Sequence, residues 1–319
     1  MGARLDESAS GVFIIAATPF ADDGTLDLES TDRLIDAYLE ADVAGITILG
    51  MMGEAPKLTP EEAREFAGHV LARVAERVPV VVGVSSPGLA ALTGLAENVM
   101  DLGAAGVMVA PPPPLPTDER YEAYVELVCR RLGPGVPVVL QDYPLTTGVH
   151  LSVPAFQRLV DACPTIVVLK HEDWPGLGKI TRIRHEAENG QQRRVAILVG
   201  NSALFYPLEL ARGADGAMTG FAFPEMLVEV HHLWQRGLHD AADDLYDAYL
   251  PLVRYEQQPG IGLAVRKEVL RRRGLLASAH VRAPSVHLTP EDHTDLDRLL
   301  GRLDRRLAAS DFQRPRITA

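Results

Sequence analysis

The sequence contains few cysteines and no long apolar run. Its 319 residues include two cysteines, Cys129 and Cys163, with no CxxC motif and no Cys/His cluster. This scarcity excludes a disulfide framework and argues against a structural zinc site, so we predict no metal. No stretch reaches the ~18 apolar residues of a membrane span, and the N-terminus lacks the apolar core of a signal peptide. We therefore expect no membrane contact and a cytoplasmic location.

Basic residues are outnumbered by acidic ones. There are 31 Lys and Arg residues against 43 Asp and Glu residues, which gives a formal net charge of −12. This balance argues against a nucleic-acid partner, because binding to a phosphate backbone needs a positive surface. It does not exclude a small anionic substrate, since one pocket can oppose the field of the whole chain. Hydrophobic residues make up 47% of the sequence, which is enough for a full buried core.

Short apolar runs, separated by amphipathic stretches, recur along the first two thirds of the chain. Most runs lack polar alternation, which is typical of strands buried on both faces of a parallel sheet. Eight strand–helix pairs at intervals of about 22–35 residues predict an α/β fold, a (β/α)8 TIM barrel. A doubly wound sheet is the alternative, but no GxGxxG motif follows the first run. The runs are Val12–Ala17, Gly45–Leu49, Val78–Val84, Ala105–Ala110, Val136–Leu140, Ile166–Leu169, Val195–Val199 and Gly216–Met218.

Helix starts and the C-terminal pattern complete the expected organisation. The stretch Thr59-Pro-Glu-Glu62 is a capping box with proline in the first helical position, and Ser152 and Thr289 have the character of further N-caps. From about residue 224 the pattern is helical only, which predicts roughly three helices beyond the barrel's eighth. We predict a barrel over 11–237, C-terminal helices packed on it over 238–309, and a frayed tail over 310–319.

Chemistry in a barrel of this kind lies at the carboxyl ends of the strands. Lys170 directly follows an apolar run that should be buried on both faces. A buried lysine has a depressed pKa or is paired with a carboxylate. With a depressed pKa, its amine can attack a ketone and form a Schiff base. The alternative is a structural ion pair with Glu172 or Asp173, and position alone does not decide between the two.

Two other strand ends offer candidate side chains. Gln141 and Tyr143 are two residues apart, so both are expected to face the barrel interior, where the phenol could move protons. Packing under the following loop is the simpler interpretation of Tyr143. Met51 and Met52 lie between glycines and would line an apolar pocket floor or only fill a buried turn. Glu54 is expected to accept backbone hydrogen bonds in that turn.

The order of these motifs resembles the dihydrodipicolinate synthase / N-acetylneuraminate lyase family. The resemblance rests on Ala17-Thr-Pro-Phe20, Gly45-Ile-Thr-Ile-Leu-Gly-Met-Met-Gly-Glu-Ala55, Lys170, Gly200-Asn-Ser202 and Gly213-Ala-Asp-Gly-Ala-Met218. It implies a barrel with C-terminal helices, a homo-oligomer (tetramer or dimer), and Schiff-base aldol or dehydration chemistry on 2-oxo acids without a cofactor. It also implies that Lys170 is the Schiff-base lysine. The predicted substrate-binding residues are Thr18, Gly50, Met51, Met52, Gly53, Gly200, Asn201 and Met218.

The chain departs from the family pattern at three strand ends. Met51-Met52 replaces a pair of threonines whose hydroxyls bind the pyruvoyl carboxylate, and a proline-rich stretch, Pro111–Pro116, replaces the tyrosine-bearing loop. Alignment on Pro144 places Gln141 where the catalytic tyrosine belongs and displaces Tyr143 by two. The replacements resemble the branch that includes the 2-keto-3-deoxy-L-arabinonate dehydratases, as does the stretch Tyr249-Leu-Pro-Leu-Val253.

We therefore predict a Schiff-base lyase acting on a 2-oxo acid, such as a 2-keto-3-deoxy sugar acid or a pyruvate-derived compound. In this hypothesis Tyr143, or a water held by Gln141, moves the proton next to the iminium. Backbone N–H groups around Gly50–Gly53, together with Lys170, hold the carboxylate against the field of a chain of charge −12. The alternatives are a dihydrodipicolinate synthase with an altered relay and a non-catalytic barrel that binds 2-oxo acids.

Overall fold

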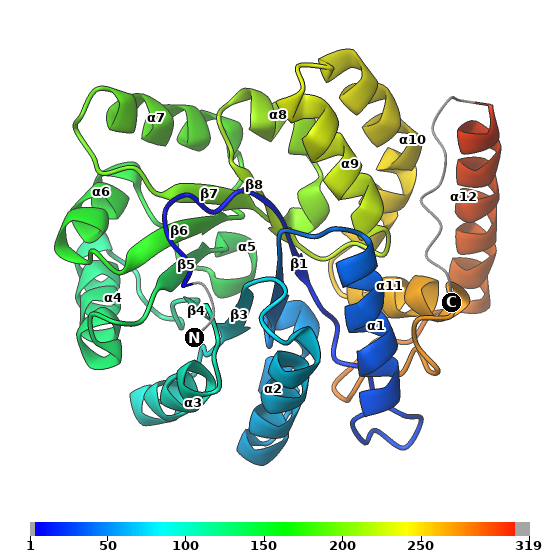
Figure 1. Cartoon of the computed structure of the whole chain (residues 1–319), viewed down its shortest axis with the longest axis horizontal. Helices are drawn as coiled ribbons and strands as arrows, with labels where there is room; N and C mark the ends of the chain where they lie inside the picture. Colours follow the sequence, from blue (N-terminus) through cyan, green and yellow to red (C-terminus); the bar gives the residue numbers. More distant parts are fainter. Residues whose placement is uncertain (1–3, 310–319) are drawn as a thin grey trace.

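The computed structural model describes residues 4–309, and they form a closed barrel of eight parallel strands with the order β1 to β8. Helices follow the strands and cover the outside of the barrel (Figure 1). The predicted (β/α)8 fold is confirmed, and the doubly wound alternative is wrong. The strands are β1 (Gly11–Ile15), β2 (Gly45–Ile48), β3 (Val80–Gly83), β4 (Gly106–Val109), β5 (Val138–Asp142), β6 (Ile166–His171), β7 (Ala196–Val199) and β8 (Gly216–Thr219).

Two helices of the barrel layer begin at caps that the sequence predicts. The capping box at Thr59 is confirmed, with hydrogen bonds in both directions to Glu62, and Ser152 caps the helix that follows it. The helices of the barrel layer are α1 (Leu28–Glu40), α2 (Pro60–Val74), α3 (Leu89–Asp101), α4 (Asp118–Leu132), α5 (Pro144–Thr147), α6 (Val153–Ala162), α7 (Leu177–Glu188), α8 (Tyr206–Ala211) and α9 (Pro224–Gln235). Short 3₁₀ turns are η1 (Met51–Gly53), η2 (Ala55–Lys57) and η3 (Asn201–Ala203).

Three helices follow α9 in the described part of the chain, as the sequence predicted. They are α10 (His239–Glu256), α11 (Gly262–Arg272) and α12 (Pro290–Ala308), the last one capped by Thr289. Figure 1 shows α10 beside α9, and α12 as the outermost helix on that side of the barrel. The limits proposed for the barrel and the extension stay a prediction, and the tail over 310–319 lies outside the described residues.

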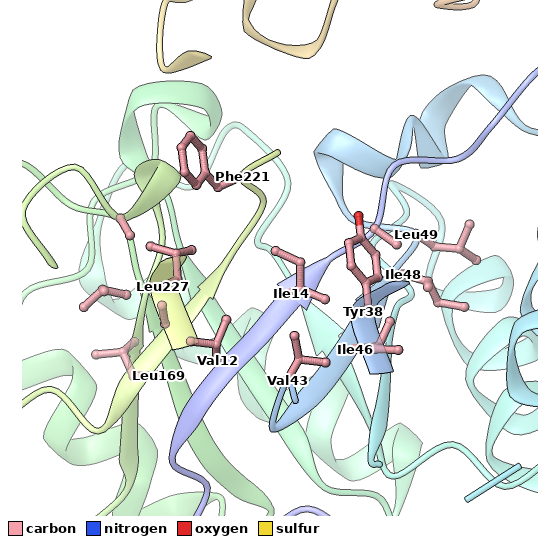
Figure 2. Packing of buried hydrophobic residues seen from close by; sticks show 14 of the residues in the cluster. Val12, Ile14, Tyr38, Val43, Ile46, Ile48, Leu49, Leu169, Phe221 and Leu227 are labelled. Carbon is pink, nitrogen blue, oxygen red and sulfur yellow. The ribbon is translucent and has the colours of Figure 1, made fainter. Parts of the chain in front are cut away.

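On most strands, side chains alternate between an inner and an outer apolar layer. On β1, Phe13 and Ile15 fill the barrel interior, whereas Val12 and Ile14 point to the surrounding helices. Figure 2 shows the outer layer, with Tyr38 of α1 placed against side chains of β1 and β2. Burial of strands on both faces explains why the apolar runs show little polar alternation. The interior layer also forms the floor beneath the carboxyl ends of the strands.

Candidate active site

Lys170 stands on the inner face of the barrel near the carboxyl end of β6. In the strand register it lies opposite Gln141 of β5 and Leu198 of β7. Val168, two residues earlier on the same face, belongs to the apolar interior layer. The side chain of Lys170 is buried, and burial is the main reason why its pKa lies below the usual value for lysine. The strand therefore presents an amine above an apolar floor.

A carboxylate accompanies this amine. The distance from Lys170 Nζ to Glu172 Oε2 is 3.2 Å, and the charge of Glu172 partly opposes the fall in the lysine pKa. Gln141 Nε2 donates a hydrogen bond of 2.7 Å to the same carboxylate oxygen. The ion pair considered as an alternative thus exists with Glu172, whereas Asp173 pairs with Lys179 at 3.0 Å. The pair does not compete with chemistry at Lys170, because its carboxylate can also accept the proton of the ammonium.

A small cavity of about 50 Å³ opens beside Lys170. It brings together the three predicted catalytic residues. Lys170 comes from β6, Gln141 from β5, and Tyr143 directly follows β5. Any ligand that reaches the amine therefore touches several elements at once. The other lining residues are Ile15, Met51, Met52, Glu172, Asn201, Ser202, Thr219, Gly220, Gln257 and Arg266.

Tyr143 is half-buried at the start of α5, directly after the end of β5. Burial is the largest cause that raises the pKa of its phenol, so the neutral form is favoured. A neutral phenol can donate its proton and take one back. Met51 and Met52 lie in η1 and line the cavity with apolar side chains. Their positions agree with the expected apolar floor, whereas their contact with a substrate stays a prediction.

Several predicted substrate-binding residues lie behind the cavity lining. Thr18 Oγ1 donates to the carbonyl of Gly53 at 2.6 Å, and the Gly53 N–H donates to Gly50 O at 3.0 Å. These bonds hold η1 in place and leave Gly53 without a free N–H for a ligand. Met218 is buried in the interior layer of the barrel. A role for these four residues in direct substrate contact stays a prediction.

The turn after β7 is strained and shapes the site. Asn201, Ser202 and Ala203 have φ angles of 52°, 53° and 57°, in the left-handed region that side chains disfavour. Asn201 Nδ2 donates to the carbonyl of Glu172 at 3.0 Å. A Cβ at Gly200 would lie 2.2 Å from Glu172 Oε1, so glycine is needed for this carboxylate to occupy its place. The turn therefore positions the partner of the lysine.

Glu54 accepts a backbone hydrogen bond, but from a residue that the sequence did not indicate. The donor is the N–H of Arg282, beyond α11, at 3.0 Å. Lys267 of α11 pairs with Glu54 at 2.5 Å, and both side chains are buried. Burial is the main cause that lowers the pKa of Lys267 to about 8. Glu54 therefore connects the end of β2 to the C-terminal helices.

Sequence reasoning did not find the two cavity residues that come from the C-terminal helices. Gln257 follows α10, and its Nε2 donates to Asn201 Oδ1 at 3.3 Å. Arg266 lies in α11, where every residue from Ala264 to Leu270 is buried. An arginine among buried apolar positions of a helix is the signal that could have indicated it, because buried charges need partners.

The described residues contain neither a cluster of metal-binding side chains nor a membrane-spanning helix. Within residues 4–309, no three His, Cys, Asp or Glu side chains group closely enough to hold a metal ion. In the same part of the chain, no helix has the length and apolar character needed to cross a membrane. The predicted lack of a cofactor stays a prediction.

The barrel and the buried amine at its carboxyl end define a TIM barrel with a candidate nucleophilic lysine. Comparison with known proteins gives the family. The sequence profile of the Dihydrodipicolinate synthetase family matches residues 8–303. The chain belongs to this family.

Three similar proteins illustrate the range of the family. An L-2-keto-3-deoxyarabonate dehydratase of Azospirillum brasilense is 32% identical over 92% of this chain and 94% of its own length. The crystal structure of a dihydrodipicolinate synthase from Rhodopseudomonas palustris is 50% identical, with a TM-score of 0.92 over 94% of this chain and 100% of that one. YagE of Escherichia coli K12, crystallised with pyruvate, is 26% identical, with a TM-score of 0.84 over 92% and 98%.

Proposed function

We propose that the protein is a Schiff-base lyase acting on a 2-oxo acid of the 2-keto-3-deoxy sugar acid class. The buried amine of Lys170 next to the carboxylate of Glu172 is the observation that carries this proposal. Similarity to the Azospirillum dehydratase supports the substrate class. The apolar pair Met51-Met52 also supports it, because it removes the hydroxyls expected of a dihydrodipicolinate synthase.

Formation of the Schiff base begins with loss of a proton from Lys170. Glu172 Oε2, 3.2 Å from the ammonium nitrogen, accepts this proton. The neutral amine then attacks C2 of the substrate to give a carbinolamine. The carbinolamine hydroxyl takes a proton from the neutral phenol of Tyr143 and leaves as water, which gives the iminium. The iminium accepts electrons from the adjacent carbon, which makes the hydrogen on C3 acidic.

The next proton transfer takes place at C3. Tyr143, which has given its phenol proton to the departing hydroxyl, or a water molecule held by Gln141, removes the C3 proton and the enamine forms. Gln141 holds Glu172 through its amide nitrogen, so its carbonyl oxygen is the atom that would hold the water. Loss of the C4 hydroxyl as water then gives a conjugated iminium. Cleavage of the C3–C4 bond would instead start from the first iminium, with removal of the C4 hydroxyl proton, and would leave an aldehyde and an enamine that takes up a proton at C3. Hydrolysis of the new iminium releases the product and returns Lys170.

A turnover screen tests the proposed substrate class. We expect release of a dehydrated or cleaved product from at least one 2-keto-3-deoxy sugar acid, and no product with the variant Lys170→Arg.

A second candidate function is dihydrodipicolinate synthesis, which the 50% identical Rhodopseudomonas structure favours. Condensation of pyruvate with aspartate semialdehyde, without turnover of the sugar acids, would select it. Tight binding of 2-oxo acids without turnover of any would instead indicate a non-catalytic barrel.

We further propose that the protein works as a homo-oligomer in the cytoplasm. The side chains of Trp174, Phe205 and Leu208 are exposed, and the rings of Trp174 and Phe205 lie 5.5 Å apart, edge to face. An apolar group of this kind on the outside of a barrel is suited to contact with a second copy. Light scattering is expected to give a dimer or tetramer, and Phe205→Asp is expected to reduce that mass; a monomer for the wild type would contradict this part of the proposal.

A further inference from the structure

Arg266 is buried at the cavity, and one nitrogen of its guanidinium has no partner. Nε donates to Glu256 Oε2 at 3.0 Å, and Nη2 donates to Ser202 Oγ at 3.1 Å. Within residues 4–309 Nη1 makes no hydrogen bond, although this atom is buried. An unpaired buried N–H group costs free energy, so such a group calls for an acceptor from outside the chain.

The end of β8 leaves room for this nitrogen. A Cβ placed on Gly220 would lie 2.1 Å from Arg266 Nη1 and 2.8 Å from Cζ. Glycine at this position therefore lets the guanidinium lie against the carboxyl end of the strand. Arg266 and Lys170 line the same cavity. Burial is the main cause of the low pKa of Lys170, and the positive charge of Arg266 lowers it further, as expected for neighbouring cations.

The other donors at the cavity suit a carboxylate less well. Lys170 is the amine that reacts with the ketone, so its nitrogen becomes part of the iminium and is not the group that holds the carboxylate. Tyr143, Ser202 and Thr219 carry neutral hydroxyls. Ser202 Oγ already accepts a hydrogen bond from Arg266 Nη2. The amide nitrogens that line the cavity donate to protein oxygens, and they belong to Gln141, Asn201 and Gln257.

We infer that Arg266 binds the carboxylate of the 2-oxo acid, a specificity role that rests on the proposed function. The two N–H groups of Nη1 supply charge-assisted hydrogen bonds to an anion. They take the place of the hydroxyls that Met51 and Met52 lack. The C-terminal helices thus provide the carboxylate site, and the catalytic strand provides the amine. A fixed local cation also explains how a chain of net charge −12 holds an anion.

The experiment traps the Schiff base with borohydride and measures the pyruvate concentration that gives half-maximal trapping. The same measurement with pyruvamide, the uncharged analogue, serves as the comparison. In Arg266→Met, we expect the half-saturating pyruvate concentration to rise about 10- to 100-fold. The value for pyruvamide should rise much less, because only the higher pKa of Lys170 acts on it. The matched control is Arg271→Met, on the same helix but half-exposed and paired with Glu268. An equal rise for both ligands, or no rise for either, would overturn the inference.

Two further variants separate recognition from folding. Arg266→Met leaves Glu256 without its guanidinium partner, so the double variant Arg266→Met/Glu256→Gln removes the uncompensated charge as well. Gly220→Ala places a methyl group where Nη1 lies and leaves the arginine in the chain. We expect both variants to lose the preference for pyruvate over pyruvamide. Each should still show a cooperative thermal unfolding transition, which indicates that it is folded. Retention of the wild-type preference by either folded variant would contradict the assigned position of the guanidinium.

Failure of the Schiff-base proposal gives a different result from failure of this inference. Absence of trapping in the wild type would contradict the proposed function alone. Calorimetric titration with pyruvate then still decides the role of Arg266. Weaker binding by Arg266→Met than by the wild type supports the carboxylate site, and equal binding, or none by the wild type, overturns it.

Discussion

At the scale of single residues, Lys170 and Glu172 form a pair that is both structural and chemical. The same 3.2 Å contact that neutralises a buried ammonium gives its proton a nearby acceptor. Burial lowers the pKa of Lys170, and the carboxylate raises it again in part. The balance between these two causes sets the pH at which the amine becomes nucleophilic.

Glu172→Gln tests this balance. Loss of the negative charge removes the cause that raises the lysine pKa, so the amine becomes neutral at lower pH. We expect the rising limb of the pH profile of pyruvate trapping to move down by about one pH unit or more. Asp173→Asn is the control, because Asp173 pairs with Lys179 instead. An unmoved or upward-moving limb in Glu172→Gln would count against the account.

Glu209 carries the second prediction at this scale. It is buried in α8, its Oε2 has no hydrogen-bond partner within the described residues, and burial raises its pKa from 4.5 to about 8. The unfolded chain therefore releases this proton at lower pH than the folded chain. Folding stability should fall as pH rises between these two values.

Replacement of the Glu209 carboxyl by an amide should abolish this loss of folding stability with rising pH. In Glu209→Gln we expect the free energy of unfolding to fall less between about pH 5 and about pH 8 than in the wild type, by an amount on the order of a few kcal/mol. Denaturant titrations at the two pH values measure it. Glu97→Gln, on the exposed side of α3, is the control. A wild-type pH dependence retained in Glu209→Gln would show that Glu209 ionises normally.

At the scale of elements, the apolar runs locate all eight strands, but the runs for β5 and β6 end too early. β5 continues to Asp142 and β6 to His171, two residues beyond the expected runs. The added residues include Gln141 and Lys170, which are polar because they form the site rather than the core. Apolar patterning therefore fails at the strand ends where function replaces packing.

The candidate site shows the same limit. Rules about barrel strands indicated Lys170, Gln141 and Tyr143, because the fold fixes which ends of the strands meet. Arg266 and Gln257 reach the cavity from helices more than eighty residues further along the chain. No local pattern encodes such a contact, since it depends on how α10 and α11 pack on the barrel.

At the scale of the whole molecule, the C-terminal helices are joined to the barrel by buried charges. Lys267 of α11 pairs with Glu54 beside η1, and Glu54 also contacts Lys57 at 3.0 Å. Arg266, the preceding residue, pairs with Glu256 and reaches the cavity. One helix therefore both links the C-terminal extension to the barrel and contributes a side chain to the cavity lining.

Lys267→Met tests this connection. It leaves the buried carboxylate of Glu54 with only its weaker partners, so we expect a loss of about 3 kcal/mol in the free energy of unfolding. The double variant Lys267→Met/Glu54→Gln should recover much of it, because the uncompensated charge is gone. Chemical denaturation of the full chain measures both. Equal losses in the single and double variants would mean that packing, not charge, dominates at this junction.

The central claim is that Lys170 forms a Schiff base with a 2-oxo acid. The most direct test is reduction of the protein with borohydride in the presence of pyruvate, followed by intact mass measurement and peptide mapping. The account predicts one reduced pyruvate adduct per chain, located on Lys170 and absent from Lys170→Arg. An unchanged intact mass, or an adduct on any other residue, would contradict it.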